Sequence, residues 1–178
     1  MTPGIDHLVL VGLPGAGKST VGPAVAARLA RRFVDLDAEI ERREGRSVVA
    51  VFAERGERYF RQCERAMTAE LASVDDPLVI ATGGGWVTNA GVVAQLRRRG
   101  RIMYLEVSPE RALARLGAGR STRPLLAGHD PLGVLRMLLE TRAPLYEAAA
   151  DLRIDTDLLT LQQLMDMIAE LASGLRGR

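Results

Sequence analysis

The chain has 178 residues, a length typical of one domain that buries a substantial core. A formal net charge of +2 is too small to argue for a nucleic-acid partner. A single cysteine, Cys63, excludes an intrachain disulfide, and no His or second Cys lies near it in sequence to suggest a metal site. The N-terminus lacks a signal-peptide pattern, and no apolar stretch approaches the ~20 residues that cross a bilayer. We therefore expect a cytoplasmic protein with no membrane partner.

Short apolar runs alternate with longer helical patterns, which is typical of βαβ units and a parallel sheet. A helix is predicted over residues 17–30. Ser108 and Asp130 each precede a proline and are predicted to cap two further helices. Asn89 is predicted to cap the helix that ends near Gly100, and Thr160 to open a C-terminal amphipathic helix. The five predicted strands are residues 7–12, 33–37, 77–82, 101–107 and 152–155.

Two stretches interrupt this alternation. Residues 38–72 are helical in pattern throughout and too long for a simple crossover between strands. Residues 117–129 are rich in Gly, Arg and Pro and have no periodicity. Because such departures in a compact α/β domain are often functional, we interpret the first as a substrate-binding insertion and the second as a lid. Both belong to a single predicted domain, residues 1–178.

A phosphate-binding loop is predicted at residues 12–19, which fit the pattern G-x-x-x-x-G-K-[ST] between a predicted strand and a predicted helix. Backbone N–H groups and the helix dipole would surround a phosphate chain there, and the Ser19 hydroxyl would hold Mg²⁺. Lys18 is the only lysine, since 23 of the 24 Lys+Arg residues are arginine. A compact ammonium reaches the β- and γ-phosphates in a nest too narrow for a planar guanidinium. The predicted nucleoside-triphosphate site comprises Gly15, Ala16, Gly17, Lys18, Ser19 and Thr20.

Seven motifs together resemble the shikimate kinase family, in the family's order and over about residues 7–156. They are GLPGAGKST at 12–20, DLD at 35–37, FAERGERYFRQCE at 52–64, TGGG at 82–85, RPLL at 123–126, RAPLY at 142–146 and IDT at 154–156. The resemblance implies a three-layer P-loop kinase fold of the nucleoside-monophosphate-kinase type, with a five-stranded parallel sheet flanked by helices. It also implies phosphorylation of shikimate by ATP with Mg²⁺, giving 3-phosphoshikimate in aromatic amino-acid biosynthesis. We expect a monomer.

Two aspartates lie at the end of the second predicted strand. If DLD stays extended, Asp35 and Asp37 point the same way, as suits two carboxylates facing a triphosphate. The resemblance assigns Asp35 to Mg²⁺ and Asp37 to the reacting hydroxyl, whose proton Asp37 would accept. The alternative is that the acids cap the following helix.

The shikimate carboxylate is assigned by the resemblance to Arg61 and Arg142, whose planar forks suit a carboxylate. Glu64, three positions after Arg61 on a helix, could hold that guanidinium in place, and Glu57 could do the same. The consecutive glycines of residues 83–85 permit close approach of a small polyol to the backbone. The resemblance therefore places Gly83, Gly84 and Gly85 in the shikimate pocket, and Trp86 is expected nearby.

The predicted lid carries Arg123, which would close over the γ-phosphate, stabilise charge and exclude water. Arg115 and Arg120 are candidates for adenine stacking and phosphate contact, and which of them contacts the nucleotide stays open. The IDT stretch resembles the family's adenine-side loop. A proline that often follows it in the family is absent here, where the sequence runs DLLT.

Three alternatives are weighed against this interpretation. A gluconate kinase shares the phosphate loop and core but leaves RPLL, Arg61 and Arg142 unexplained. A nucleoside-monophosphate kinase needs a base-reading pocket that the insertion does not show. An inactive kinase-like interaction module could lose Asp37 or Arg123 without harm to binding, yet both are present.

Overall fold

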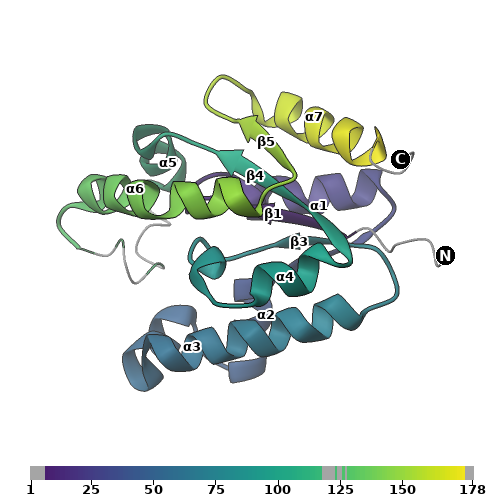
Figure 1. Cartoon of the computed structure of the whole chain (residues 1–178). Helices are drawn as coiled ribbons and strands as arrows, with labels where there is room; N and C mark the ends of the chain where they lie inside the picture. Colours follow the sequence, from purple (N-terminus) through teal and green to yellow (C-terminus); the bar gives the residue numbers. More distant parts are fainter. Residues whose placement is uncertain (1–6, 118–122, 124–125, 127, 175–178) are drawn as a thin grey trace.

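A computed structural model describes residues 7–117, 123, 126 and 128–174 of the chain. A five-stranded sheet with the order β2-β3-β1-β4-β5 forms the centre, and every neighbouring pair is parallel (Figure 1). All five predicted strands are confirmed to within two residues at each end. The strands are β1 His7–Val11, β2 Arg32–Asp35, β3 Leu78–Ala81, β4 Gly100–Glu106 and β5 Leu152–Asp155.

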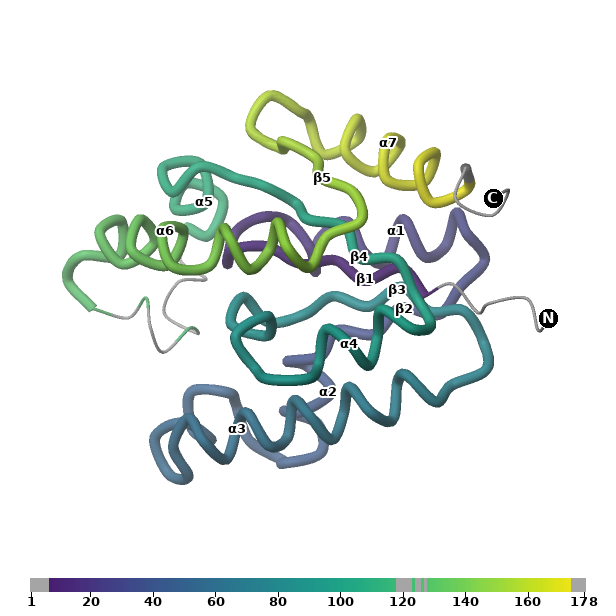
Figure 2. Tube along the Cα trace, in the orientation of Figure 1, coloured from purple at the N-terminus to yellow at the C-terminus, as the bar shows by residue number. Residues whose placement is uncertain are grey.

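Helices flank the sheet on both sides, so the predicted fold class is confirmed (Figure 1). In the view of Figure 2, α3 lies at the bottom of the molecule and α7 at the top. None of the helices within the described residues is both long enough and apolar enough to cross a membrane. The helices are α1 Lys18–Arg28, α2 Leu36–Glu44, α3 Val48–Ser73, the short 3₁₀ helix η1 Trp86–Thr88, α4 Val92–Arg97, α5 Pro109–Leu116, α6 Pro131–Ala149 and α7 Leu161–Gly174.

Three of the four predicted helix caps are confirmed. Ser108 Oγ accepts from Arg111 N, Asp130 Oδ1 from Gly133 N, and Thr160 Oγ1 from Gln163 N. The prediction for Asn89 is wrong. Gly91, with φ 86°, occupies the N-cap of α4 without a side-chain hydrogen bond, because two residues separate Asn89 from the start of this helix.

The helical stretch between β2 and β3 is divided by a bend within α3. Gly56 has φ 79° and ψ 168°, a left-handed conformation that an L side chain rarely adopts. The two segments of α3 therefore run in different directions, and the short first segment lies beside the mouth of a cavity described below. The core is aliphatic, with all five residues of β1 buried, as expected of a parallel strand covered on both faces.

Candidate active site

The phosphate loop connects β1 to α1 at the carboxyl edge of the sheet. Gly15 and Gly17 have φ values of 87° and 97°, in the region that favours glycine. A methyl group at Gly15 would lie 2.6 Å from the Ala112 carbonyl oxygen, so the loop is also packed too closely for a side chain. The chain then enters α1 directly, with Val21 N donating to Gly17 O over 2.9 Å. The result is a backbone cradle at a helix N-terminus, suited to an anion.

Lys18 crosses this loop from the first turn of α1. Its Nζ donates to the carbonyl oxygens of Gly12 at 2.7 Å and Leu13 at 2.9 Å, and the residue is buried. Burial lowers the pKa of Lys18 to about 7, and the positive charge of Arg123 acts in the same direction. Asp37 and Asp35 oppose this shift. A bound polyphosphate would restore full protonation, because opposite charge raises an amine pKa.

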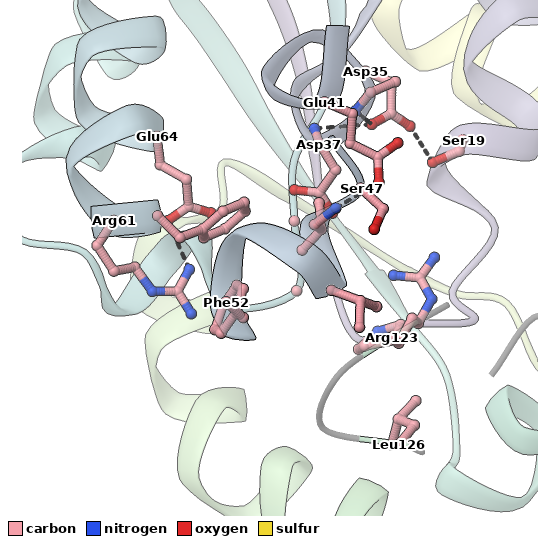
Figure 3. A pocket seen from close by; sticks show the side chains of 18 of the residues that line it. Ser19, Asp35, Asp37, Glu41, Ser47, Phe52, Arg61, Glu64, Arg123 and Leu126 are labelled. Atoms are coloured by element: carbon pink, nitrogen blue, oxygen red, sulfur yellow. Dashed lines mark hydrogen bonds and ion pairs between the residues drawn. The ribbon is translucent and has the colours of Figure 1, made fainter. Parts of the chain in front are cut away.

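Asp35 has two roles in the site. Ser19 Oγ donates to one of its oxygens, Oδ2, while Oδ1 accepts from Asp37 N at 3.1 Å and Ala38 N at 3.2 Å. The expectation of an extended DLD segment is therefore wrong, because Asp35 caps α2 and the helix begins at Leu36. The capping alternative holds for Asp35, yet both aspartates still face the same space (Figure 3).

Asp37 presents an ionisable oxygen without a partner. Its Oδ1 is buried and has no hydrogen bond to any described residue. Burial raises the pKa of Asp37 to about 6, with further contributions from the negative charges of Asp35 and Glu64. Arg123 and Lys18 act against this rise. Such a carboxylate is mostly ionised near pH 7 and can still accept a proton, as a general base requires.

Arg61 and Glu64 form the predicted pair on α3. Arg61 Nη1 donates to Glu64 Oε2 over 2.6 Å (Figure 3). Arg61 Nη2 donates to Glu57 Oε1 over 3.0 Å. Glu64 is fully buried, which raises its pKa, while the charge and hydrogen bond of Arg61 oppose the rise. Arg142 on α6 is 8% exposed and has no ion pair within the described residues. A buried guanidinium of this kind is suited to an anionic ligand.

The three glycines of residues 83–85 fit closely between charged groups. A methyl group at Gly83 would lie 2.7 Å from Asp37 Oδ1 and 3.3 Å from Glu64 Oε1. One at Gly85 would lie 3.0 Å from Arg61 Cζ. A side chain at either position would displace these charged groups, and its absence leaves the backbone within reach of the two carboxylates and the guanidinium.

The glycine segment is anchored from two sides by aromatic residues. The hydroxyl of Tyr146, on α6, donates to Gly84 O. Trp86 is fully buried, and its indole N–H donates to Thr68 Oγ1 on α3 over 3.0 Å. Trp86 therefore lies beside the glycine segment, as expected, but points toward α3 and does not line the cavity.

Two adjoining cavities occupy this edge of the sheet. One, of about 740 Å³, extends from Asp37 to Arg61 and Arg142, and the other, of about 370 Å³, lies over the phosphate loop. Four side chains line both of them: Ser19, Asp35, Asp37 and Arg123. A group bound in one cavity can therefore meet a group bound in the other beside Asp37.

Known proteins resemble this chain over nearly its whole length. The family model described as shikimate kinase matches residues 14–172. The chain belongs to the shikimate kinase family. A shikimate kinase of Symbiobacterium thermophilum is 45% identical over 173 residues, which are 97% of each protein. One of Chromohalobacter salexigens is 47% identical over 154 residues, 86% of this chain and 84% of that protein.

Solved structures agree with the family assignment. The shikimate kinase from Acinetobacter baumannii in complex with shikimate has a TM-score of 0.91 and 38% identity, covering 98% of this chain and 96% of that one. A gluconokinase from Sinorhizobium meliloti has a TM-score of 0.59 at 22% identity, covering 96% and 95%. The second likeness shows a shared fold only, which explains why a gluconate kinase was an alternative for the sequence.

The predicted lid of this shikimate kinase family member lies mostly outside the described residues, and so does Arg120. Arg123 is described and half-buried, and its Nε is without a hydrogen-bond partner in that part of the chain. Leu126 is buried and lines the larger cavity. Arg115 donates to the hydroxyl of Thr156 at 2.8 Å and to its carbonyl oxygen at 2.6 Å, beside the smaller cavity.

Several contacts at the site were not predicted. Tyr146 lies within the RAPLY motif, so a signal was present, but its bond to Gly84 spans 62 residues of sequence. Leu159, Leu161 and Leu164 line the smaller cavity. Leu159 lies within the DLLT departure, and Leu161 and Leu164 lie in the predicted C-terminal helix, but neither pattern indicated that they reach the site. Asn89 reaches α3, and no local pattern indicated this contact.

Proposed function

We propose that this protein transfers the γ-phosphoryl group of ATP to the 3-hydroxyl of shikimate, giving 3-phosphoshikimate and ADP in aromatic amino-acid biosynthesis. Family membership over residues 14–172 supports the reaction. The observation that carries the site assignment is the unpartnered oxygen of Asp37, where the phosphate-loop cavity adjoins the arginine-lined cavity. Donor and acceptor could meet there with the base already in place.

The larger cavity suits a small carboxylated polyol. Arg61 and Arg142 supply two guanidinium groups for the carboxylate, from α3 and α6. The backbone of Gly83, Gly84 and Gly85 supplies polar groups without side chains. This arrangement orients the ring so that one hydroxyl faces Asp37, and such orientation accounts for much of the rate enhancement in phosphoryl transfer.

Asp37 acts on the acceptor hydroxyl. Its pKa of about 6 leaves it ionised at neutral pH, so it accepts a hydrogen bond from the hydroxyl and takes the proton as the O–P bond forms. The bond from the γ-phosphorus to the bridging oxygen breaks at the same time, and ADP leaves. Lys18 and Arg123 stabilise the negative charge on the transferred group, because Lys18 lines the smaller cavity, Arg123 lines both cavities, and both charges act on Asp37.

Magnesium is the expected cofactor, and Ser19 and Asp35 fit it. A hydroxyl and a carboxylate already in contact are hard oxygen donors of the kind Mg²⁺ prefers, together with water and phosphate oxygens. Bound there, the ion would neutralise charge on the β- and γ-phosphates. A site that relies on phosphate oxygens needs few protein carboxylates, and no cluster of three or more metal-ligating side chains occurs among the described residues.

The remaining assignments concern the nucleotide and the state of the protein. We assign the adenine to the space between Arg115 and the leucines at 159, 161 and 164. We further propose that the protein acts as a monomer in the cytoplasm, on small molecules and not on nucleic acid. Arg120 stays a candidate for phosphate contact, by resemblance alone.

ADP release from Mg-ATP tests the proposal, with shikimate, gluconate and a nucleoside monophosphate as parallel acceptors. Turnover should depend on shikimate and fall by about 10²–10⁴-fold in Asp37→Asn, which keeps the shape but removes the base. Turnover with gluconate would overturn the substrate, and full activity of Asp37→Asn would overturn the base. Nucleotide binding without any active acceptor would favour an interaction module.

A further inference from the structure

Asn89 lies at the end of η1 and reaches across to α3. Its side chain is nearly buried, at 5% exposed for the residue. Nδ2 donates to Arg61 O at 2.8 Å and to Glu64 Oε2 at 3.3 Å, and Oδ1 accepts from Arg65 Nη1 at 2.7 Å. All the polar atoms of this amide are thus directed at one turn of α3, the turn that carries Arg61 and Glu64.

Arg65 determines which way the Asn89 amide faces. A guanidinium can only donate, so it binds the carbonyl end of the amide and leaves both Nδ2 hydrogens for Arg61 O and Glu64 Oε2. With the amide reversed, its NH₂ group would face the guanidinium and its oxygen would face two acceptors. Arg65 is itself outside the cavity lining.

Asn89 and Arg61 bind the same oxygen of Glu64. Oε2 accepts from Arg61 Nη1 at 2.6 Å and from Asn89 Nδ2, whereas Oε1 is buried and has no partner among the described residues. A methyl group at Gly83 would lie 3.3 Å from Oε1, so this oxygen faces the cavity beside Asp37. The carboxylate is therefore held through Oε2, and Oε1 is left facing the cavity.

We propose that Asn89, oriented by Arg65, is a positioning residue that fixes the Glu64 carboxylate and the Arg61 guanidinium for binding of shikimate. The inference rests on the proposed function and goes beyond it, since neither residue contacts the cavity. The charged groups facing Glu64 come from three helices: Arg61 on α3, Arg142 on α6 and Asp37 on α2. Without Asn89 the carboxylate can rotate among them.

The electrostatics of Glu64 agree with this role. Burial raises the pKa of Glu64, and the opposing influences are the charge and hydrogen bond of Arg61, the hydrogen bond of Asn89 and the charge of Arg142. Removing the Asn89 amide would take away one of the bonds that favour the ionised form. A protonated Glu64 would hold Arg61 less firmly.

Steady-state kinetics of wild type, Asn89→Ala and Arg65→Ala test the inference, with Arg58→Ala as matched control. Arg58 is an exposed arginine on the same helix, away from the cavity. Asn89→Ala should raise KM for shikimate about tenfold, equivalent to about 1.4 kcal/mol. Arg65→Ala should raise it about threefold through loss of one hydrogen bond. KM for ATP should stay within about twofold in all variants, because the smaller cavity is untouched.

A double-mutant cycle with Glu64→Gln separates positioning from general destabilisation. If Asn89 acts through Glu64, Asn89→Ala should raise KM much less in the Glu64→Gln background than in wild type. Equal effects in both backgrounds, or equal rises in KM for ATP and shikimate, would overturn the inference. Should Asn89→Ala fail to fold, the same cycle with Arg65→Ala decides it. Absence of shikimate turnover in the wild type would instead overturn the proposed function, and the inference with it.

Discussion

The nucleotide side and the acceptor side of this site are built differently. The phosphate cradle of the nucleotide side comes from one continuous stretch, residues 12–20, whose glycines and helix start create it. The acceptor side is assembled from α2, α3, α6 and the segment before η1, which are far apart in the sequence. Backbone N–H groups dominate the first side, and buried charged side chains dominate the second.

This difference teaches how each side keeps its shape. A backbone cradle is rigid because local φ and ψ values define it, so it needs few side-chain contacts. Converging side chains must be held individually, and the acceptor side does so with hydrogen bonds to Glu64, Arg61 and Gly84. On the nucleotide side, a substitution should therefore lower activity only where the residue itself contacts the nucleotide. On the acceptor side, a substitution should also act indirectly, by releasing a side chain that another residue holds in place.

The largest effect on the use of ATP is expected from Lys18→Arg. The Lys18 ammonium lies against the phosphate loop, with Nζ 2.7 Å from Gly12 O and 2.9 Å from Leu13 O. A planar guanidinium does not fit in this space. We expect kcat/KM for ATP to fall by about 10²–10³-fold, typical for loss of one transition-state donor. The reverse exchange on the same helix, Arg28→Lys at the surface, should change little. Retained activity in Lys18→Arg would contradict the view that the cradle is rigid.

Arg142→Lys should give the next largest effect, confined to the acceptor. Lysine keeps the charge and loses the planar fork, so KM for shikimate should rise by roughly 10–100-fold while KM for ATP changes little. Arg136→Lys serves as control, because Arg136 lies on α6 as Arg142 does and forms only an exposed ion pair with Glu110 of α5. An equal change in both KM values would mean that the two sides are not separable.

Asp37→Asn should stabilise the fold while it lowers turnover. The folded pKa of about 6 lies above the unfolded value of 3.8, so ionisation of Asp37 destabilises the native state above pH 6. The asparagine variant should be more stable by roughly 1–3 kcal/mol at pH 8, a rise in Tm of about 3–10 °C. As pH falls from 6 toward 4, wild type gains this stability by protonation and the difference should shrink. Melting curves across this pH range measure it, and a difference independent of pH would contradict the assignment.

The smallest effect is expected at Thr156. Its hydroxyl accepts from Arg115 and donates to Glu106 O, so it holds Arg115 beside the nucleotide cavity. Thr156→Val removes this hydroxyl, and because the Arg115 bond to the backbone remains, KM for ATP should rise only about threefold. KM for shikimate should be unchanged. A larger rise in KM for shikimate than in KM for ATP would mean that Arg115 belongs to the acceptor side and not to the nucleotide side.

The sequence predicts local features of this protein well and distant contacts poorly. The strands, the phosphate loop and the caps at Ser108 and Asp130 depend on residues within a few positions, so periodicity and capping rules find them. The ion pair between Arg61 and Glu64 was predictable for the same reason, because the two residues lie one turn apart.

The failures arise where local rules compete. Residues 35–37 were expected to stay extended, with a helix cap as the alternative, but the strand ends at Asp35, whose carboxylate satisfies two N–H groups of α2. Asn89 satisfied the rule for a helix cap, yet the partners of its side chain are on α3, 24 to 28 residues back in the chain. The RAPLY motif drew attention to Tyr146, but nothing near it in the sequence indicates that its hydroxyl donates to Gly84 O. Such bonds follow from the packing of whole elements, which a local pattern does not contain.

The strand order also has a consequence for how the chain folds during synthesis. β1 leaves the ribosome first but occupies the middle of the sheet, and its partners begin only at Leu78 and Gly100. Its buried apolar side chains and its backbone groups therefore have no sheet partner until β3, Leu78–Ala81, has emerged, and they lack the second partner until β4, Gly100–Glu106, has followed. Pairings of such long range are slow to form. The nascent chain is most prone to aggregate in this interval. A chaperone that binds β1 at this stage would prevent aggregation most effectively.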